Sequence, residues 1–173
     1  VIEASYLRFL AIFDKLLQGH PFVLGDRPSS ADFAIYAQLT QLAKFDPTPM
    51  QLCLQHAPRV HAWTDIVDDL SGQPADDDGW LEPEQLRNHL DDLLSEVGRV
   101  YIPALLANKA AIDAGADQMD TTIDGQRWTQ PTFPYQAKCL QALRQSYFSL
   151  DPADRDSVDT VLKGTGCEAF LGS

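Results

Sequence analysis

Apolar residues in the first seventy positions recur three and four residues apart, the spacing of helices with one buried face. This spacing predicts a helix over 5–18, a second over 30–45 and, after a short helical piece at 51–56, a third over 58–70. The second helix is apolar over much of its circumference, so we expect it at the centre of the core. The apolar stripe of the third helix comprises Val60, Trp63, Ile66, Val67 and Leu70.

The second half of the chain continues the helical pattern with one interruption. A long helix is expected from Pro83 to Ala114 with a kink at Pro103, because proline cannot complete the helical hydrogen bonding. Asp124 and Gly125 form a favoured two-residue turn, which predicts a hairpin over 119–130. Further helices are predicted at 135–150 and 152–162. The predicted fold class is therefore all-α, a helical bundle with a small β-hairpin ornament.

A short acidic stretch separates the two halves. Residues 73–82 carry a proline, several aspartates and a glycine but little to bury, so we expect a solvated linker. The predicted organisation is a helical core over 1–72, this linker, and a helical extension over 83–173 packed on the core. A calcium loop is the alternative, yet Pro74 and Gln85 would occupy its first and twelfth ligand positions, where carboxylates are needed.

Charge and cysteine content exclude several functions. The net charge is −12, from 13 basic and 25 acidic residues, and no basic cluster suits a nucleic acid. We find no membrane span and no signal peptide, so we expect a cytoplasmic protein. Three scattered cysteines encode neither a disulfide framework nor a zinc site. No metal is expected, because His56 and His61 straddle Pro58 and because His20 and His89 have no obvious companion.

The most concentrated local signal lies just before the second helix. In the stretch Ser29-Ser30-Ala31-Asp32, the Ser29 hydroxyl can accept from a first-turn amide while the Asp32 carboxylate accepts from the amide of Ser29. We interpret this as a structural N-capping box. A catalytic serine is the alternative, but the nearest histidine, His20, has no recognisable third group to orient it.

The order of these features resembles a known family. An amphipathic helix, then "PFVLGDRPSSADFAIYAQLTQL", then "PRVHAWTDIVDDL" is similar to the C-terminal all-helical domain of bacterial glutathione S-transferase-like proteins. In that family an apolar link precedes a Ser/Thr-x-x-Asp box whose acid is buried. The resemblance covers residues 5–70, and the rest looks like an extension found in some bacterial members. It is carried by Phe22, Leu24, Gly25, Pro28, Ser29, Ala31, Asp32, Pro58, Arg59, Val60 and Trp63.

The resemblance implies a division of labour. Family members bind and activate glutathione mainly through a thioredoxin-like N-terminal domain, and no βαβ pattern of that kind occurs in these residues. The chain alone is therefore predicted to be inactive and to hold no cofactor, while glutathione is expected for the full-length parent. The helical domain would line a pocket for a small apolar electrophile, and a homodimer of the parent is left open. The alternative is a non-catalytic helical module that binds a ligand or a protein.

Candidates for such a pocket come from the second half of the chain. Tyr101 and Asn108 are seven residues apart on one predicted helix and should share a face, and three further candidates follow the hairpin turn. Core packing or ordinary exposure is the commoner role for each of them. For Cys139 we expect burial rather than reactivity. The candidate pocket residues are Tyr101, Asn108, Trp128, Tyr135 and Gln136.

Overall fold

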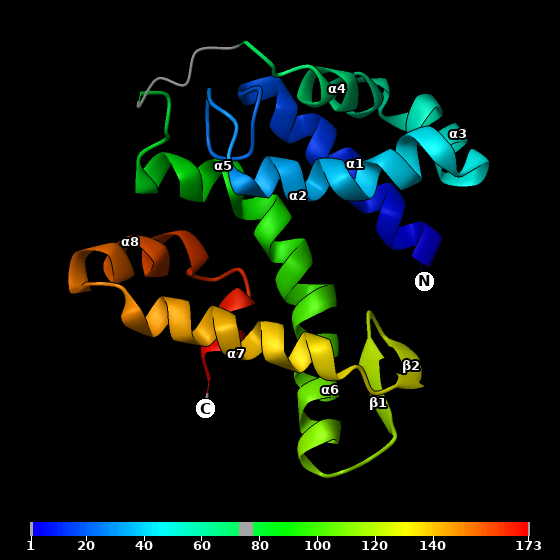
Figure 1. Cartoon of the computed structure of the whole chain (residues 1–173), viewed down its shortest axis with the longest axis vertical. Helices are drawn as coiled ribbons and strands as arrows, with labels where there is room; N and C mark the ends of the chain where they lie inside the picture. Colours follow the sequence, from blue (N-terminus) through cyan, green and yellow to red (C-terminus); the bar gives the residue numbers. More distant parts are fainter. Residues whose placement is uncertain (1, 73–77, 173) are drawn as a thin grey trace. The chain divides into compact units, whose positions relative to one another are not determined.

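The helices expected from the apolar spacing are present in the computed structural model, which describes residues 2–72 and 78–172 (Figure 1). The fold class is the predicted one, all-α with a small two-stranded antiparallel sheet. Contacts divide the chain into two units, Val1–Leu90 and Asp91–Ser173. The predicted linker and calcium-loop alternative lie partly outside the described residues, and the packing of 83–173 on 1–72 stays a prediction.

The first unit is a helical bundle. Helix α1 packs against α3 and α4, and α2 packs on α4. In its core the Trp63 ring meets the Phe13 ring edge-on, with the centroids 4.9 Å apart. The elements are α1 (Ile2–Gly19), α2 (Ser30–Leu39), the π-helix η1 (Thr40–Phe45), α3 (Pro47–His56), α4 (Pro58–Asp68) and the beginning of α5 (Pro83–Glu96).

Helix α2 is less central than its composition suggests. Asp32 and Leu39 are its buried residues, whereas Phe33 is 49% exposed, and Phe45 in the π-helical continuation is 79% exposed. The expectation of a central helix was therefore wrong. An all-round apolar composition does not reveal which sides a helix has neighbours on, and here the fully buried aromatic and aliphatic side chains come mainly from α1 and α4.

The loop between α1 and α2, residues 20–29, is held by a short backbone pairing. The amide of Asp26 donates to the Gly79 carbonyl at 2.8 Å, and the amide of Leu81 donates to the Leu24 carbonyl at 3.0 Å. Gly25 lies at the crossing with a φ of 135°, and a Cβ there would be 2.3 Å from the Gly79 oxygen. Only glycine fits this position. The segment that follows the acidic stretch is thus tied to the α1–α2 loop.

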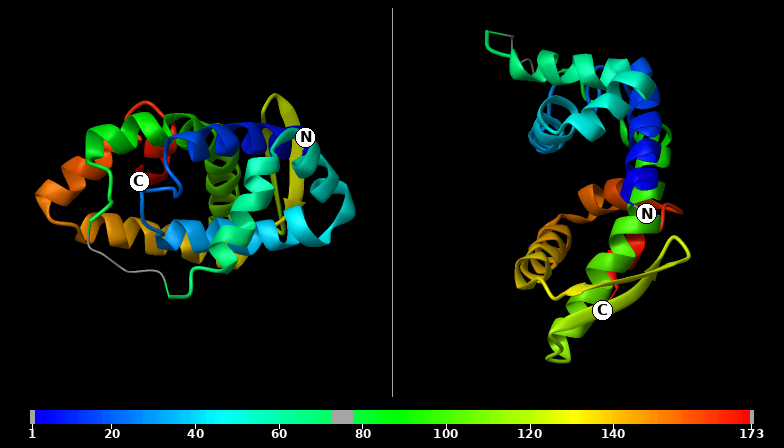
Figure 2. Two further views of the ribbon diagram at one scale, coloured as in Figure 1. Left: turned by 90° about the horizontal axis from the view of Figure 1, so that it is seen from above. Right: turned by 90° about the vertical axis from the view of Figure 1, so that its right-hand side faces the viewer.

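The second unit combines helices with the predicted hairpin. The hairpin packs against α6 (Figure 2), and Asp124 and Gly125 both have positive φ, as the predicted tight turn requires. Its elements are the end of α5, the π-helix η2 (Val97–Tyr101), α6 (Ile102–Asp113), β1 (Gln118–Ile123), β2 (Gln126–Pro131), α7 (Pro134–Ser149), α8 (Pro152–Leu162) and the 3₁₀-helix η3 (Cys167–Leu171).

A π-helical turn stands just before Pro103, where we expected a kink. Proline has no amide hydrogen to bond the carbonyl four residues earlier, and its ring would crowd that carbonyl. The wider turn of η2 ends with the Ile102 amide donating to the Val97 carbonyl, five residues back. The π-helical turn thus accommodates the proline through a local increase in the number of residues per turn. Among the described helices, none has the length and apolar character needed to cross a bilayer.

We predict that Gly98→Ala destabilises the protein. Gly98 lies in η2 against the backbone at 165–167, and a Cβ would be 2.1 Å from the Thr165 carbonyl oxygen and 2.8 Å from the Gly166 carbonyl carbon. The backbone must shift, so we expect a loss of about 2–3 kcal/mol in the free energy of unfolding. Urea denaturation measures this loss.

Gly19→Ala is the matched control, because it also adds a Cβ to a helical glycine. Its nearest neighbour would be a His89 ring atom at 3.6 Å, which is ordinary contact. Alanine is the better helix former, so we expect stability within about 1 kcal/mol of the wild type. Equal stability of the two variants would show that the close approach at Gly98 has no energetic weight.

Candidate functional site

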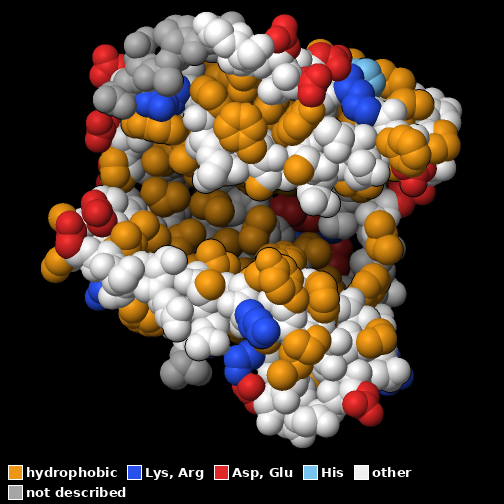
Figure 3. Space-filling model, viewed as in Figure 1, with side chains coloured by type: hydrophobic (Ala, Val, Ile, Leu, Met, Phe, Trp, Pro, Cys, Tyr) orange, Lys and Arg blue, Asp and Glu red, His pale blue; other side chains and the backbone are white. Residues whose placement is uncertain are grey.

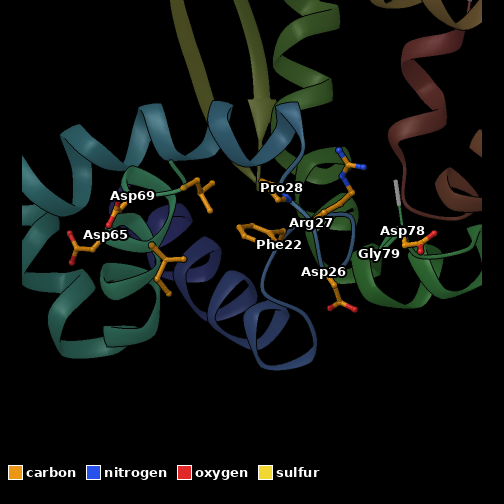
Figure 4. Close-up of a pocket in the computed structure, with 10 residues that line it drawn as sticks. Phe22, Asp26, Arg27, Pro28, Asp65, Asp69, Asp78 and Gly79 are labelled. Carbon is orange, nitrogen blue, oxygen red and sulfur yellow. The ribbon is translucent and has the colours of Figure 1, made fainter. Parts of the chain in front are cut away.

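A cavity of about 740 Å³ lies in the first unit, between the α1–α2 loop and α4 (Figure 4). We call it the loop–α4 pocket. Phe22 occupies its middle in the close-up, with aspartates of α4 and its C-terminal end on one side and Asp78 and Gly79 on the other. The lining residues are Phe22, Asp26, Arg27, Pro28, Asp65, Ile66, Asp69, Leu70, Asp78 and Gly79.

The buried carboxylate of Asp32 positions the loop wall of this pocket. Asp32 is fully buried at the head of α2, and its Oδ2 accepts from the Ser29 amide at 2.8 Å and from the Ser29 hydroxyl at 2.7 Å. The Ser29 side chain also faces the Asp32 amide. The other oxygen, Oδ1, accepts from the Val23 amide at 2.8 Å, a bond that the local sequence pattern did not predict. One side chain therefore fixes the loop on both sides of its turn.

A second tie connects the loop to α4. The Trp63 indole Nε1 donates to the Pro21 carbonyl at 2.8 Å, and Phe22 beside it is 7% exposed. The opposite wall offers Ile66 of α4, which is 54% exposed, and the half-buried Leu70 just after the end of α4. The sequence placed Ile66 and Leu70 in a core stripe, whereas both line the pocket. Among the apolar lining residues, Phe22 is therefore already packed in place, whereas Ile66 remains exposed to solvent.

Acidic groups dominate the pocket electrostatically. Four of the lining side chains are carboxylates and one, Arg27, is a cation. The Arg27 guanidinium lies 4.5 Å from the centre of the Trp80 ring, while Asp65 accepts from Lys44 at 2.8 Å. Figure 3 shows acidic side chains beside exposed hydrophobic ones on the same unit. Such surroundings favour a neutral or cationic ligand over an anionic one.

The candidates from the sequence lie elsewhere, in the second unit. Asn108 is fully buried, and its side chain donates to the Phe133 carbonyl at 3.0 Å and accepts from the Phe133 amide at 2.7 Å. Tyr101, in contrast, is 45% exposed.

The other three candidates make local contacts. Within the hairpin, the Trp128 indole Nε1 donates to Gln130 Oε1 at 2.9 Å. Tyr135 is 66% exposed, and the centroid of its ring lies 6.2 Å from that of the Phe133 ring. The backbone amide of Gln136 donates to the Phe133 carbonyl at 3.1 Å. None of the five lines the loop–α4 pocket. Their role in a pocket stays a prediction.

Two of the three thiols of this chain are poorly suited to nucleophilic chemistry. Burial raises the pKa of the Cys53 and Cys167 thiols, which keeps both protonated near neutral pH. Cys139 is only partly buried, so the expectation of burial was incorrect there. Burial also raises the pKa of Tyr101. In the described ranges, no group of three or more His, Cys, Asp or Glu side chains is arranged to hold a metal ion.

The histidines have companions that the sequence did not reveal. His20 Nδ1 lies 2.9 Å from the Asp26 carboxylate, and the His20 and His89 rings meet edge-on with centroids 5.1 Å apart. The sequence indicated neither an orienting group for His20 nor a companion for His20 and His89, and both statements were wrong. The fold of the α1–α2 loop and the position of α5 bring these partners together. The Ser29 hydroxyl nevertheless donates to Asp32, which favours a structural role over a nucleophilic one.

Comparison with known proteins identifies the first part of the chain. Residues 2–65 match the family described as Glutathione S-transferase, C-terminal domain. These residues form a glutathione S-transferase C-terminal-like helical domain, as the resemblance over 5–70 predicted. Neither the curated proteins nor the solved structures gave a significant match.

We predict that Asp32→Ala is strongly destabilising. The substitution leaves the buried amides of Val23 and Ser29 without their acceptor, so we expect a loss of the order of 3 kcal/mol in the free energy of unfolding. Asp32→Asn should be nearly as costly, because the asparagine NH₂ group is a donor and would face either the Val23 amide or the Ser29 amide and hydroxyl, which are donors too. Thermal and urea denaturation measure both losses.

Asp46→Ala is the matched control for a helix cap. The Asp46 carboxylate caps α3 by accepting from the Thr48 amide at 3.2 Å, but it is exposed. Its loss should cost about 1 kcal/mol. If Asp32→Ala were no worse than Asp46→Ala, burial would add nothing to the cap and the predicted role of Asp32 would be refuted.

Proposed function

We propose that this glutathione S-transferase C-terminal-like domain supplies the pocket for a small apolar electrophile in a glutathione transferase-like protein. The observation that carries the proposal is the position of the loop–α4 pocket, whose loop wall lies within the matched residues 2–65. Its apolar surface comes from Phe22, Pro28, Ile66 and Leu70. Concave, mostly apolar surfaces with a few polar groups are typical of small-molecule sites.

The charge of the pocket supports a division of labour with another domain. Glutathione carries two carboxylates, which four pocket aspartates would repel. We therefore propose that glutathione is bound and activated by a thioredoxin-like N-terminal domain of the parent, and that this chain alone is inactive. The free thiols of Cys53, Cys139 and Cys167 are compatible with the cytoplasmic location that we also propose.

A non-catalytic ligand-binding module is the second candidate. The lining residues are aspartate, arginine, glycine, proline and apolar types, and none of them is a serine, cysteine, lysine, histidine or tyrosine. The pocket itself thus offers binding but no hydroxyl, thiol, amine or imidazole nucleophile. Under this alternative the parent would bind the same apolar compounds without conjugating them to glutathione.

We predict that the chain binds neutral phenylnaphthylamine more tightly than anilinonaphthalene sulfonate, which adds an anionic sulfonate to the same rings. Repulsion by the pocket carboxylates is the reason. Ile66→Ser should weaken phenylnaphthylamine binding by about fivefold, because an apolar contact is lost. Asp69→Asn should strengthen binding of the sulfonate. Fluorescence titration measures both probes.

Leu54→Ser is the matched control, since Leu54 is an exposed helical leucine, 47% accessible, outside the pocket. It should leave both affinities unchanged. Equal effects of Ile66→Ser and Leu54→Ser, or preferential binding of the sulfonate, would place the apolar site elsewhere.

Glutathione binding separates this chain from its parent. We predict that immobilised glutathione does not retain this chain, because its acidic pocket disfavours the tripeptide, whereas it retains the parent with a thioredoxin-like domain. Retention of this chain would contradict the division of labour. A parent that binds phenylnaphthylamine but shows no conjugation of electrophiles would favour the non-catalytic module.

A further inference from the structure

The His20–His89 contact lies where α5 meets the end of α1 and the α1–α2 loop. The His89 ring packs against the end of α1, with Nδ1 at 3.6 Å from the position that a Cβ on Gly19 would take. The backbone of Phe22 forms a hydrogen bond with the same ring. His89 Nε2 is buried and has no hydrogen-bond partner within residues 2–72 and 78–172. The His89 ring, on α5, is therefore packed against the end of α1 and the α1–α2 loop.

Proton positions follow from these contacts. An ionised carboxylate only accepts hydrogen bonds, so the 2.9 Å contact with Asp26 places a proton on His20 Nδ1. A proton on the buried His89 Nε2 finds no acceptor among the described residues. Burial is the main cause that lowers the pKa of His89, and the charge of His20 lowers it further.

Other charges near this contact do not reverse the effect. The α1–α2 loop presents His20 together with Asp26, whose carboxylate is already engaged by His20. The charge that acts on His89 is that of His20, and the Phe22 backbone bond opposes it. On the two helices that meet at this contact, the charged residues near it in sequence are Lys15, one turn before the end of α1, and Arg87, Asp91 and Asp92, which flank His89 on α5.

We propose that His20, Asp26 and His89 form an acid-sensitive clamp, which holds residues 78–90 on the α1–α2 loop and loosens when His89 takes up a proton. The clamp acts beside the backbone pairing of Asp26 with Gly79 and of Leu81 with Leu24. Its loosening would weaken these two bonds first. The inference goes beyond the proposed function, because the conformational readouts need no ligand.

The sign of the pH effect follows from the lowered pKa of His89. Above about pH 6.5 both the folded and the unfolded states carry a neutral His89, so the clamp keeps its full stability. As the pH falls below that value, the unfolded or opened state binds the proton first, and stability is lost until the pH has passed through the folded-state pKa. The closed clamp is therefore the neutral-pH form.

Hydrogen exchange at single amides tests the clamp. We expect the protection factors of the Asp26 and Leu81 amides to fall at least about threefold between about pH 7.5 and about pH 5, after correction for intrinsic rates. The Ala57 amide, which donates to the Cys53 carbonyl at 2.8 Å, should keep its protection and serves as the reference. An equal fall at Ala57 would mean global unfolding and would overturn the proposal.

Three variants separate titration from packing. His89→Gln should remove the acid-specific fall and His20→Gln should reduce it, because the charge of His20 is the smaller of the two causes that lower the pKa of His89. His56→Gln, at an exposed position on α3, should retain the full fall. The His20 variant keeps the test valid if His89→Gln does not fold. A wild-type fall in both clamp variants, or its loss in His56→Gln, would overturn the proposal. So would an NMR titration midpoint of His89 equal to that in the urea-unfolded chain.

Discussion

The fold of the first unit depends on one buried carboxylate. Asp32 lies within the protein at the head of α2, where it accepts hydrogen bonds from the amides of Val23 and Ser29 and from the Ser29 hydroxyl. A buried charge is tolerated only when such donors replace water. In return the donors fix the path of the α1–α2 loop. The loop in turn presents Phe22 to the pocket and His20 to α5, so the geometry of both sites originates at this residue.

Much of this architecture could be predicted because its signals are local. The helices follow from apolar spacing, the hairpin from the Asp124–Gly125 turn, and the Asp32–Ser29 amide bond from a four-residue pattern. The π-helical turns could not be predicted in the same way. Each π-helical turn continues an α-helix and differs from it only in the number of residues per turn. The residues up to Phe45 and Tyr101 therefore have the same apolar and polar pattern that an α-helix would have.

The pocket and the histidine contact escaped prediction for a different reason. Ile66 belongs to the apolar stripe of α4, yet its side chain is exposed and lines the pocket. Only the tertiary arrangement distinguishes such a position from one in the core. His20 and His89 are separated by most of the first unit, and backbone pairing around Gly25 is needed before they meet. Long-range contacts of this kind have no periodicity to detect in a single sequence.

The close approach at Gly98 has a consequence for the order of events during synthesis. The Cys167 thiol donates to the Leu94 carbonyl across 73 positions, and the backbone around Gly166 lies directly on the π-helical turn. The ribosome releases the early side of this contact well before the late side emerges. The first unit can therefore assemble while translation continues, whereas the backbone around Gly98 stays uncovered until residues 165–167 have been synthesised.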